Sequence, residues 1–129
     1  MRINFRVITC SMFVLSMCIA CRHSGHDGAN TSVKISESNG EYCMSAYFNG
    51  NKTKKIHEYM DQHLGDHHNF SFANTTIDGS LTLDDRTTFY IKASDGDLEI
   101  KLDKEKNSYE SYTRVKKMCE GIKEIIGKD

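Results

Sequence analysis

The length and charge of the chain bound what it can be. It has 129 residues, with 17 Lys and Arg against 18 Asp and Glu, no Pro, no Trp and a formal net charge of −1. This balance, without any basic stripe, argues against nucleic acid as a main partner. The length suffices for one domain with one modest core.

The first 20 residues have the pattern of a secretory leader. Arg2 and Arg6 form a short basic segment, and residues 7–20 are uncharged and largely apolar, a stretch too short for a comfortable membrane span. We therefore predict a signal peptide over residues 1–20. Residues 21–31 contain Gly and Ser but no bulky apolar side chain, which predicts a flexible tether. A single globular domain is expected over residues 32–129.

The end of the leader, Ile19-Ala20-Cys21, resembles the lipobox of bacterial prolipoproteins. The resemblance covers the leader alone, and Cys18 stands where that family usually has Leu. It implies that Cys21 is acylated and becomes the mature N-terminus, so that the lipid tethers the protein to a membrane of the cell envelope. Arg22 is not an inner-membrane retention signal of that family, which favours the outer membrane. The alternative is ordinary cleavage after Ala20, which gives a plain secreted protein.

Possible glycosylation acceptors leave a eukaryotic secreted origin open. Asn-x-Ser/Thr triplets begin at Asn30, Asn51, Asn69 and Asn74. A chain this rich in Asn, Ser and Thr also produces such triplets by chance, so they do not outweigh the bacterial leader.

Alternating apolar and polar residues on both sides of Asn39-Gly40 predict a β-hairpin at the start of the domain. A two-residue loop at this Asn-Gly pairs Ile35 with Met44 and places Cys43 on the opposite, polar face. The apolar face is then formed by Val33, Ile35, Met44, Ala46 and Phe48.

A helix and an extended stretch follow the hairpin. Over residues 53–64 the apolar positions recur at a spacing of three and four, and Gly65 should end the helix. The stripe toward the core is Ile56, Tyr59, Met60, His63 and Leu64. Residues 70–83, rich in Thr and apolar side chains, predict one long strand that is bent or bulged near Gly79.

The last third of the chain predicts two more strands and a long helix. After a turn at 84–86, residues 89–93 and 98–102 alternate apolar and polar side chains, as half-buried antiparallel strands do. Asn107 and Glu110 resemble a capping box at the start of the helix. Its buried stripe is Tyr112, Val115, Met118, Cys119, Ile122, Ile125 and Ile126. The order ββαβββα predicts an α+β fold, a five-stranded antiparallel sheet with two helices packed on one face.

Two cysteines remain within the expected domain. An even pair in an oxidising compartment favours a disulfide. Cys119, however, falls on the buried stripe of the last helix, whereas Cys43 falls on the opposite face of the sheet. Unless the hairpin register slips by one residue, the sheet separates the two sulfurs, so we expect no bond between them.

Four histidines come closest to a chemical motif: His57, His63, His67 and His68. Zinc requires three or four ligands that converge tetrahedrally. His57 is expected on the wet side of the helix and His63 on the core stripe, about 120° away, and Gly65 separates His63 from His67. We therefore expect no metal and no cofactor, with His63 a hydrogen-bonded residue at the core boundary. A metal-binding protein or hydrolase that uses residues 57–68 is the alternative.

The predicted outer face of the sheet carries aromatic and basic side chains, with Tyr47, Tyr90 and Lys92 among them. Such residues supply contact area at protein interfaces. The sequence contains no Gly-x-Ser-x-Gly elbow and no phosphate-binding glycine loop. We therefore expect a small membrane-tethered envelope lipoprotein that acts as a noncatalytic protein-binding or accessory module, with these three residues contacting the partner.

Overall fold

The computed structural model describes residues 31–65, 69–73 and 75–128. The predicted leader 1–20, Cys21 and the predicted tether up to residue 30 lie outside these ranges. The order of strands and α-helices is ββαβββα, which confirms the predicted α+β fold. In chain order the elements are β1 (Ser32–Glu37), β2 (Glu41–Tyr47), the 3₁₀ turn η1 (Gly50–Lys52), α1 (Thr53–Leu64), β3 (Ile77–Thr82), β4 (Thr88–Ser94), β5 (Asp97–Asp103), the 3₁₀ turn η3 (Lys104–Lys106) and α2 (Tyr109–Gly127).

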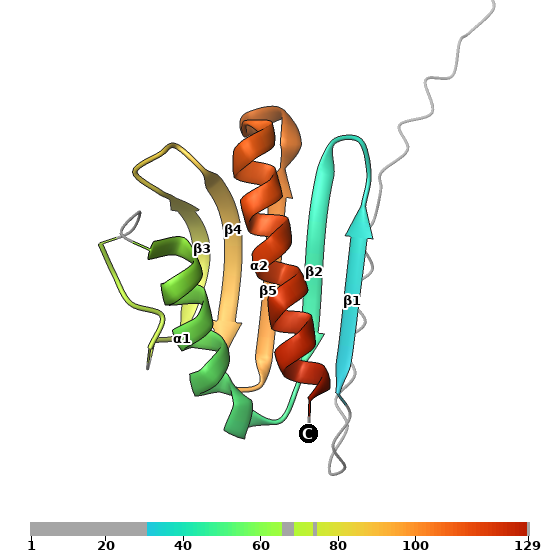
Figure 1. Ribbon diagram of the computed structural model, residues 1–129, viewed down its shortest axis with the longest axis vertical. Helices are drawn as coiled ribbons and strands as arrows, with labels where there is room; N and C mark the ends of the chain where they lie inside the picture. Colours follow the sequence, from blue (N-terminus) through green and yellow to red (C-terminus); the bar gives the residue numbers. More distant parts are fainter. Residues whose placement is uncertain (1–30, 66–68, 74, 129) are drawn as a thin grey trace, which may run out of the picture.

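The strands form one antiparallel sheet in the order β1-β2-β5-β4-β3 (Figure 1). The hairpin register is the predicted one, because Ile35 lies opposite Met44. Its loop is closed by the N–H of Ser38, which donates to the carbonyl of Glu41 at 2.9 Å. β5, from the C-terminal half, therefore lies at the centre, and β1 and β3 form the two edges.

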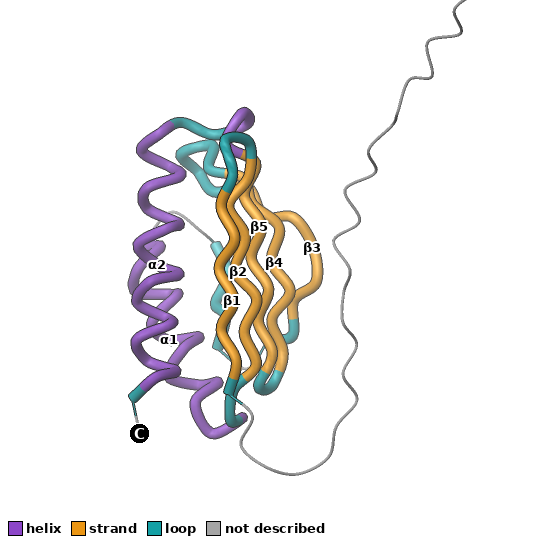
Figure 2. Tube along the Cα trace, turned by 90° about the vertical axis from the view of Figure 1, so that its right-hand side faces the viewer, coloured by secondary structure: helices purple, strands orange, loops and turns teal. Residues whose placement is uncertain are grey.

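Both helices cover the same face of the sheet, as Figure 2 shows from the side. In Figure 1, α1 lies over the side of β3 and β4, and α2 lies over β5 and β2. One parity of β2, β4 and β5 points toward the helices, because side chains alternate between the faces of a strand. The buried centre of the core includes Met44, Ile56, Met60, Leu64, Ile91, Ile100, Leu102, Val115, Met118 and Ile122.

The predicted stripe of α2 is confirmed, but the residue that caps the helix is different. Ser108 is the N-cap, and its Oγ accepts a hydrogen bond from the N–H of Ser111 at 3.0 Å. Asn107 instead bonds to the backbone of Thr88, where it accepts from the N–H and donates to the carbonyl, each at 2.8 Å. The capping box at Asn107 was therefore wrong, because that side chain fastens the helix entry to β4.

The two helices pack closely where Gly121 of α2 meets Tyr59 of α1. A methyl group on Gly121 would overlap the hydroxyl and Cζ of Tyr59 and lie only 3.0 Å from its Cε1. Lys52, just before α1, adds a polar link, because its Nζ donates to the carbonyls of Ile126 at 2.8 Å and Lys128 at 2.6 Å. A cation at the C-terminal end of a helix satisfies carbonyls that have no partner within the helix.

The prediction of one long strand over residues 70–83 is wrong. β3 begins only at Ile77, and it pairs with β4 without a bulge, with Gly79 directly opposite Ile91. The reason lies in α1, where the Asp61 carboxylate accepts from the N–H of Phe72 at 2.9 Å. The chain before β3 is thus held against the helix instead of extending along the sheet.

Candidate functional site

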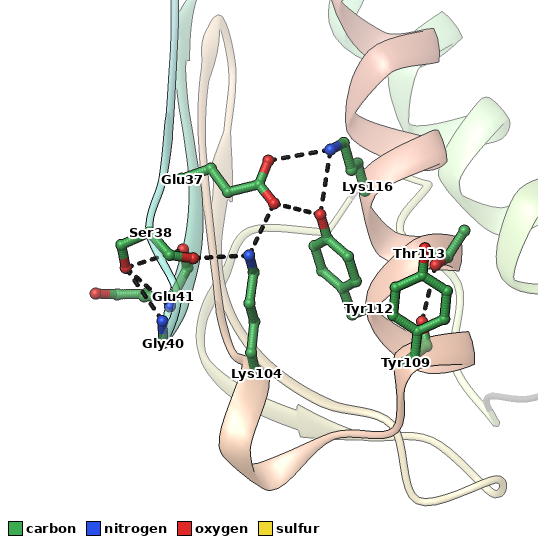
Figure 3. Close-up of polar contacts among 9 residues, drawn as sticks. All are labelled: Glu37, Ser38, Gly40, Glu41, Lys104, Tyr109, Tyr112, Thr113 and Lys116. Carbon is green, nitrogen blue, oxygen red and sulfur yellow. Dashed lines mark hydrogen bonds and ion pairs between the residues drawn. The ribbon is translucent and has the colours of Figure 1, made fainter.

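A polar cluster beside the N-terminal part of α2 joins three separate segments of the chain (Figure 3). Glu37 ends β1, Lys104 begins η3, and Tyr112 and Lys116 are one turn apart on α2. One carboxylate oxygen of Glu37 accepts from Lys104 Nζ at 2.8 Å and from the Tyr112 hydroxyl. The other oxygen accepts from Lys116 Nζ at 3.0 Å. Together with Tyr109, we call these residues the tyrosine–lysine corner.

A row of three tyrosine rings runs through this corner from the core to the surface. Tyr42 is 1% exposed and meets the Tyr112 ring edge-on, with the ring centroids 6.1 Å apart. The ring centroid of Tyr112 in turn lies 5.8 Å from that of Tyr109, which is 81% exposed. Each ring is thereby supported by the one beneath it, and the outermost ring is presented to solvent from the first turn of a helix.

The charges of the corner are fixed by the same contacts. The hydrogen bonds from Lys104, Tyr112 and Lys116, in decreasing order of effect, lower the pKa of Glu37 from 4.5 to about 2. The Lys116 pKa is raised above its ordinary value by its bonds to Tyr112 and then Glu37. The Lys104 ammonium also lies 4.6 Å from the centroid of the Tyr112 ring. The corner therefore holds two ammonium groups against one carboxylate.

An open depression of about 360 Å³ lies at the foot of the corner, lined by Lys104, Asn107, Ser108, Tyr109 and Tyr112. Two of its three hydroxyl groups are already engaged, because Ser108 caps α2 and Tyr112 donates to Glu37, whereas Tyr109 is exposed. The arrangement offers a ring, an ammonium group and polar side chains to a binding partner. No activated nucleophile faces the depression among the side chains that line it.

The structure places Tyr47, Tyr90 and Lys92 on the outer face of the sheet, as predicted, but does not bring them together. Tyr47 is on β2 and is 51% exposed, whereas Tyr90 and Lys92 are on β4, with β5 between the two strands. Lys92 lies in register between Asp78 on β3 and Glu99 on β5. Charges of both signs thus alternate across this face.

Tyr90 is held within the sheet surface. Its hydroxyl donates to the Asp78 carboxylate at 2.8 Å, and the Lys101 ammonium lies 5.6 Å from the ring centroid. The hydrogen bond to Asp78, followed by burial, raises the pKa of Tyr90. Tyr90 is therefore only half-exposed, and Tyr47 offers the larger exposed ring on this face.

The histidines do not form a cluster in the described part of the chain. His63 is a hydrogen-bonded boundary residue, as predicted, with its Nε2 3.1 Å from the carbonyl oxygen of Arg114. His57 was expected on the wet side of α1 but is buried, at 4% exposed. It shares a helix face with Asp61, whose carboxylate accepts a hydrogen bond from the N–H of Phe72 in the chain after α1.

His67 and His68 lie outside the described residues. Over residues 31–65, 69–73 and 75–128, no three His, Cys, Asp or Glu side chains are placed so that they could hold a metal ion together.

A second polar cluster ties the turn before β4 to α2. Arg114 donates to the Asp85 carboxylate and to Thr87 Oγ1, the latter at 2.6 Å, and Thr87 Oγ1 donates to Ser111 Oγ at 2.7 Å. Burial alone would raise the pKa of Asp85, but the bonds from Thr87 and Arg114 lower it. Ser111 is buried and faces Thr87 and Ser108, so this hydroxyl is part of the packing and has no base beside it among the contacts described.

The cysteines are placed as the hairpin register predicts. Cys119, on α2, is buried in the core. Cys43 is half-buried on the opposite, outer face of the sheet, and no disulfide joins the two. Burial, with a contribution from Glu120, raises the pKa of the Cys119 thiol to about 12. Cys21 lies outside the described residues. Of the helices that the structure describes, neither has the length and apolar character needed to cross a membrane.

The sequence did not point to the tyrosine–lysine corner. Its charged members come from residues 37, 104 and 116, and no spacing rule connects positions so far apart. One signal was present, since Tyr109 falls at the start of α2 on the side away from the core stripe. A tyrosine at such a position is exposed, and this could have been read from the helical period.

Comparison with known proteins gives no guide to this site. No protein-family model, no curated protein and no solved structure matches the chain. A functional assignment therefore has to come from the residues of the chain itself.

Proposed function

We propose that the chain is a small lipid-anchored protein of the cell envelope, favoured at the outer membrane, which acts as a noncatalytic protein-binding module. Its partner docks on the tyrosine–lysine corner. The observation that carries this proposal is the 81% exposure of Tyr109 at the rim of the 360 Å³ depression. Aromatic side chains are enriched at the energetic centres of protein interfaces.

The corner is ordered before a partner arrives. Tyr109 is supported by Tyr112, which is itself fixed by Glu37 and by the buried Tyr42. A side chain that is already ordered loses less conformational freedom on binding, which leaves more of the contact energy for affinity. The Lys104 ammonium already donates to Glu37 and to the carbonyl of Ser38 at 2.7 Å. The excess of two ammonium groups over one carboxylate in the corner still favours a partner segment that carries a carboxylate next to an apolar side chain.

The anchor is part of the proposal and has its own test. Cys21→Ser should move the protein from the membrane fraction to the soluble secreted fraction. The wild-type mass should exceed that of the polypeptide 21–129 by a diacyl or triacyl group. An unmodified N-terminal Cys21 would show that the chain is a plain secreted protein.

The outer sheet face is the second candidate contact surface, because Tyr47 is 51% exposed there. A photo-crosslinking amino acid at position 109 or at position 47, in cells, tells the two surfaces apart. We expect an adduct with one envelope protein from position 109. Adducts from position 47 alone would move the contact to the face of Tyr47, Tyr90 and Lys92, and adducts from neither position would contradict a binding module.

Affinity measurements with the purified partner complete the test. Tyr109→Ala should weaken the complex tenfold or more, because truncating an interface anchor of this kind costs over about 1.4 kcal/mol. Tyr47→Ala is the matched control on the other face and should leave the affinity within about twofold. Stoichiometric zinc in untagged protein, lost together with activity in a His67→Ala, His68→Ala variant, would support the metal-binding alternative instead.

A further inference from the structure

The edge strand β1 presents a row of backbone groups that no other strand of the described sheet covers. Hydrogen-bonded pairs alternate along an antiparallel hairpin, and the bond from Ser38 to Glu41 sets their phase. The N–H and C=O groups of residues 32, 34 and 36 therefore face β2. Those of Val33, Ile35 and Glu37 point away from the sheet, at its open edge.

β1 carries Lys34, one of the devices that protect an edge strand, but lacks a bulge and a proline. It pairs with β2 over six consecutive residues without a bulge, and it contains no proline. Its only charged side chain on the outer face is Lys34, since Glu37 is bonded to α2. The opposite edge differs, because β3 has Gly79 at its middle, which weakens strand pairing.

The apolar side of β1 is also incompletely covered. Ile35 shares the inner face with Met44, yet it is 36% exposed, whereas Met44 is fully buried. Figure 1 shows the reason, since α2 lies over β5 and β2 and β1 extends beyond it. A further strand added at this edge would cover the flank of Ile35 as well as the open backbone groups.

We propose that β1 pairs with β1 of a second copy of this chain, in an antiparallel register that is symmetric about Ile35. Residues that lie opposite each other on two paired strands point to the same face of the sheet. In β1 the odd-numbered residues lie on the inner face, so a sheet with both inner faces on one side pairs odd residues with odd and even residues with even. The register centred on Ile35 sets Ile35 opposite Ile35, Val33 opposite Glu37 and Lys34 opposite Ser36. The next register, centred on Lys34, would set two ammonium groups directly opposite each other, which is unfavourable.

A second copy of the chain fits this edge with its own β1. In the register centred on Ile35, the outward backbone groups of residues 33, 35 and 37 meet those of 37, 35 and 33, so every open donor and acceptor finds a partner. Both sets of helices then lie on the same face of one continuous sheet of two copies. The two-fold axis passes between the paired Ile35 residues.

The contact is a weak one that a membrane surface would strengthen. Two paired strands of six residues bury less than the roughly 1,000 Å² that a stable interface needs. Confinement to one membrane raises the effective concentration of the copies. This part of the inference rests on the lipid anchor proposed above, whereas the register does not.

Disulfide trapping in cells tests the register. In the full chain with Cys43→Ser, Ile35→Cys should form a 35–35 disulfide, because hydrogen-bonded partners are about 5.5 Å apart at Cα. Val33→Cys in the same background is the matched control, since position 33 faces position 37 of the other copy and should give no 33–33 disulfide. Peptide mapping identifies the link whether or not Cys21 carries lipid, so failure of the anchor and failure of the pairing are distinguishable.

A second variant separates loss of pairing from loss of fold. Ile35→Pro removes an N–H that points outward, which edge strands tolerate. It should abolish crosslinking of native dimers by a short amine-reactive reagent in membranes while buried Cys119 stays protected from alkylation. Equal disulfide yields from positions 33 and 35, mixed disulfides with another protein only, or unchanged dimers in Ile35→Pro would each overturn the proposal.

Discussion

Replacing Gly121 by Ala should destabilise the protein, although the same change stabilises an ordinary helix. In an exposed helix interior, Ala is better than Gly by about 1 kcal/mol. Here the new methyl group would overlap the Tyr59 ring, so the ring must move. Overpacking of this kind costs about 1–3 kcal/mol, which gives a net loss of up to about 2 kcal/mol in the free energy of unfolding.

A double-mutant cycle checks the reasoning. In a Tyr59→Ala background the overlap is gone, so adding Gly121→Ala should raise the free energy of unfolding by about 1 kcal/mol. Urea denaturation followed by circular dichroism measures all four proteins. If Gly121→Ala has the same effect in both backgrounds, the close approach of the two helices at this point is refuted.

The other predictions concern the core, the acid response and the thiols. Ile122→Ala, at a fully buried position, should cost about 2–4 kcal/mol, while the exposed neighbour Lys123→Ala should stay within about 0.5 kcal/mol, both by urea denaturation. The pKa of Glu37 is lowered on folding, so its contribution to stability is present above about pH 4.5 and is lost as the pH falls toward 2; Glu37→Gln should flatten the stability curve in that window, and an unchanged curve would contradict the network. Protein purified without reductant should yield both Cys43 and Cys119 as thiols after denaturation, and a linked peptide would contradict the assigned faces.

Local sequence patterns correctly predicted the first hairpin and α1, because the residues that pair or pack in these elements are close together in the sequence. The alternation around Asn39-Gly40 fixes which side chains share a face, and the two-residue loop that Asn-Gly favours then selects one register, which the structure has. The spacing of apolar residues together with Gly65 likewise placed α1 at Thr53–Leu64, with Gly65 at φ 57° after it.

The sequence predictions were wrong where a contact between distant residues overrides the local conformational preference. The extended propensity of residues 70–76 loses to the carboxylate of Asp61, which holds the backbone at Phe72. His57, which the helical period alone assigns to water, is buried on the side of α1 that carries Asp61. The tyrosine–lysine corner depends on the order of strands in the sheet, because only that order brings Glu37 beside α2.

The position of β1 also decides how the domain responds to mechanical load. If Cys21 is held at a membrane, tension enters the sheet at Ser32, whose partner is Tyr47, and it peels the pairs of the hairpin one at a time. The last pair contains Glu37, which is bonded to Lys116 of α2 and therefore resists separation. Pulling on single molecules should therefore give an early short extension before the main unfolding event, at a lower force in Glu37→Ala. The remaining four strands stay covered by both helices, so the protein can lengthen under tension without losing its core.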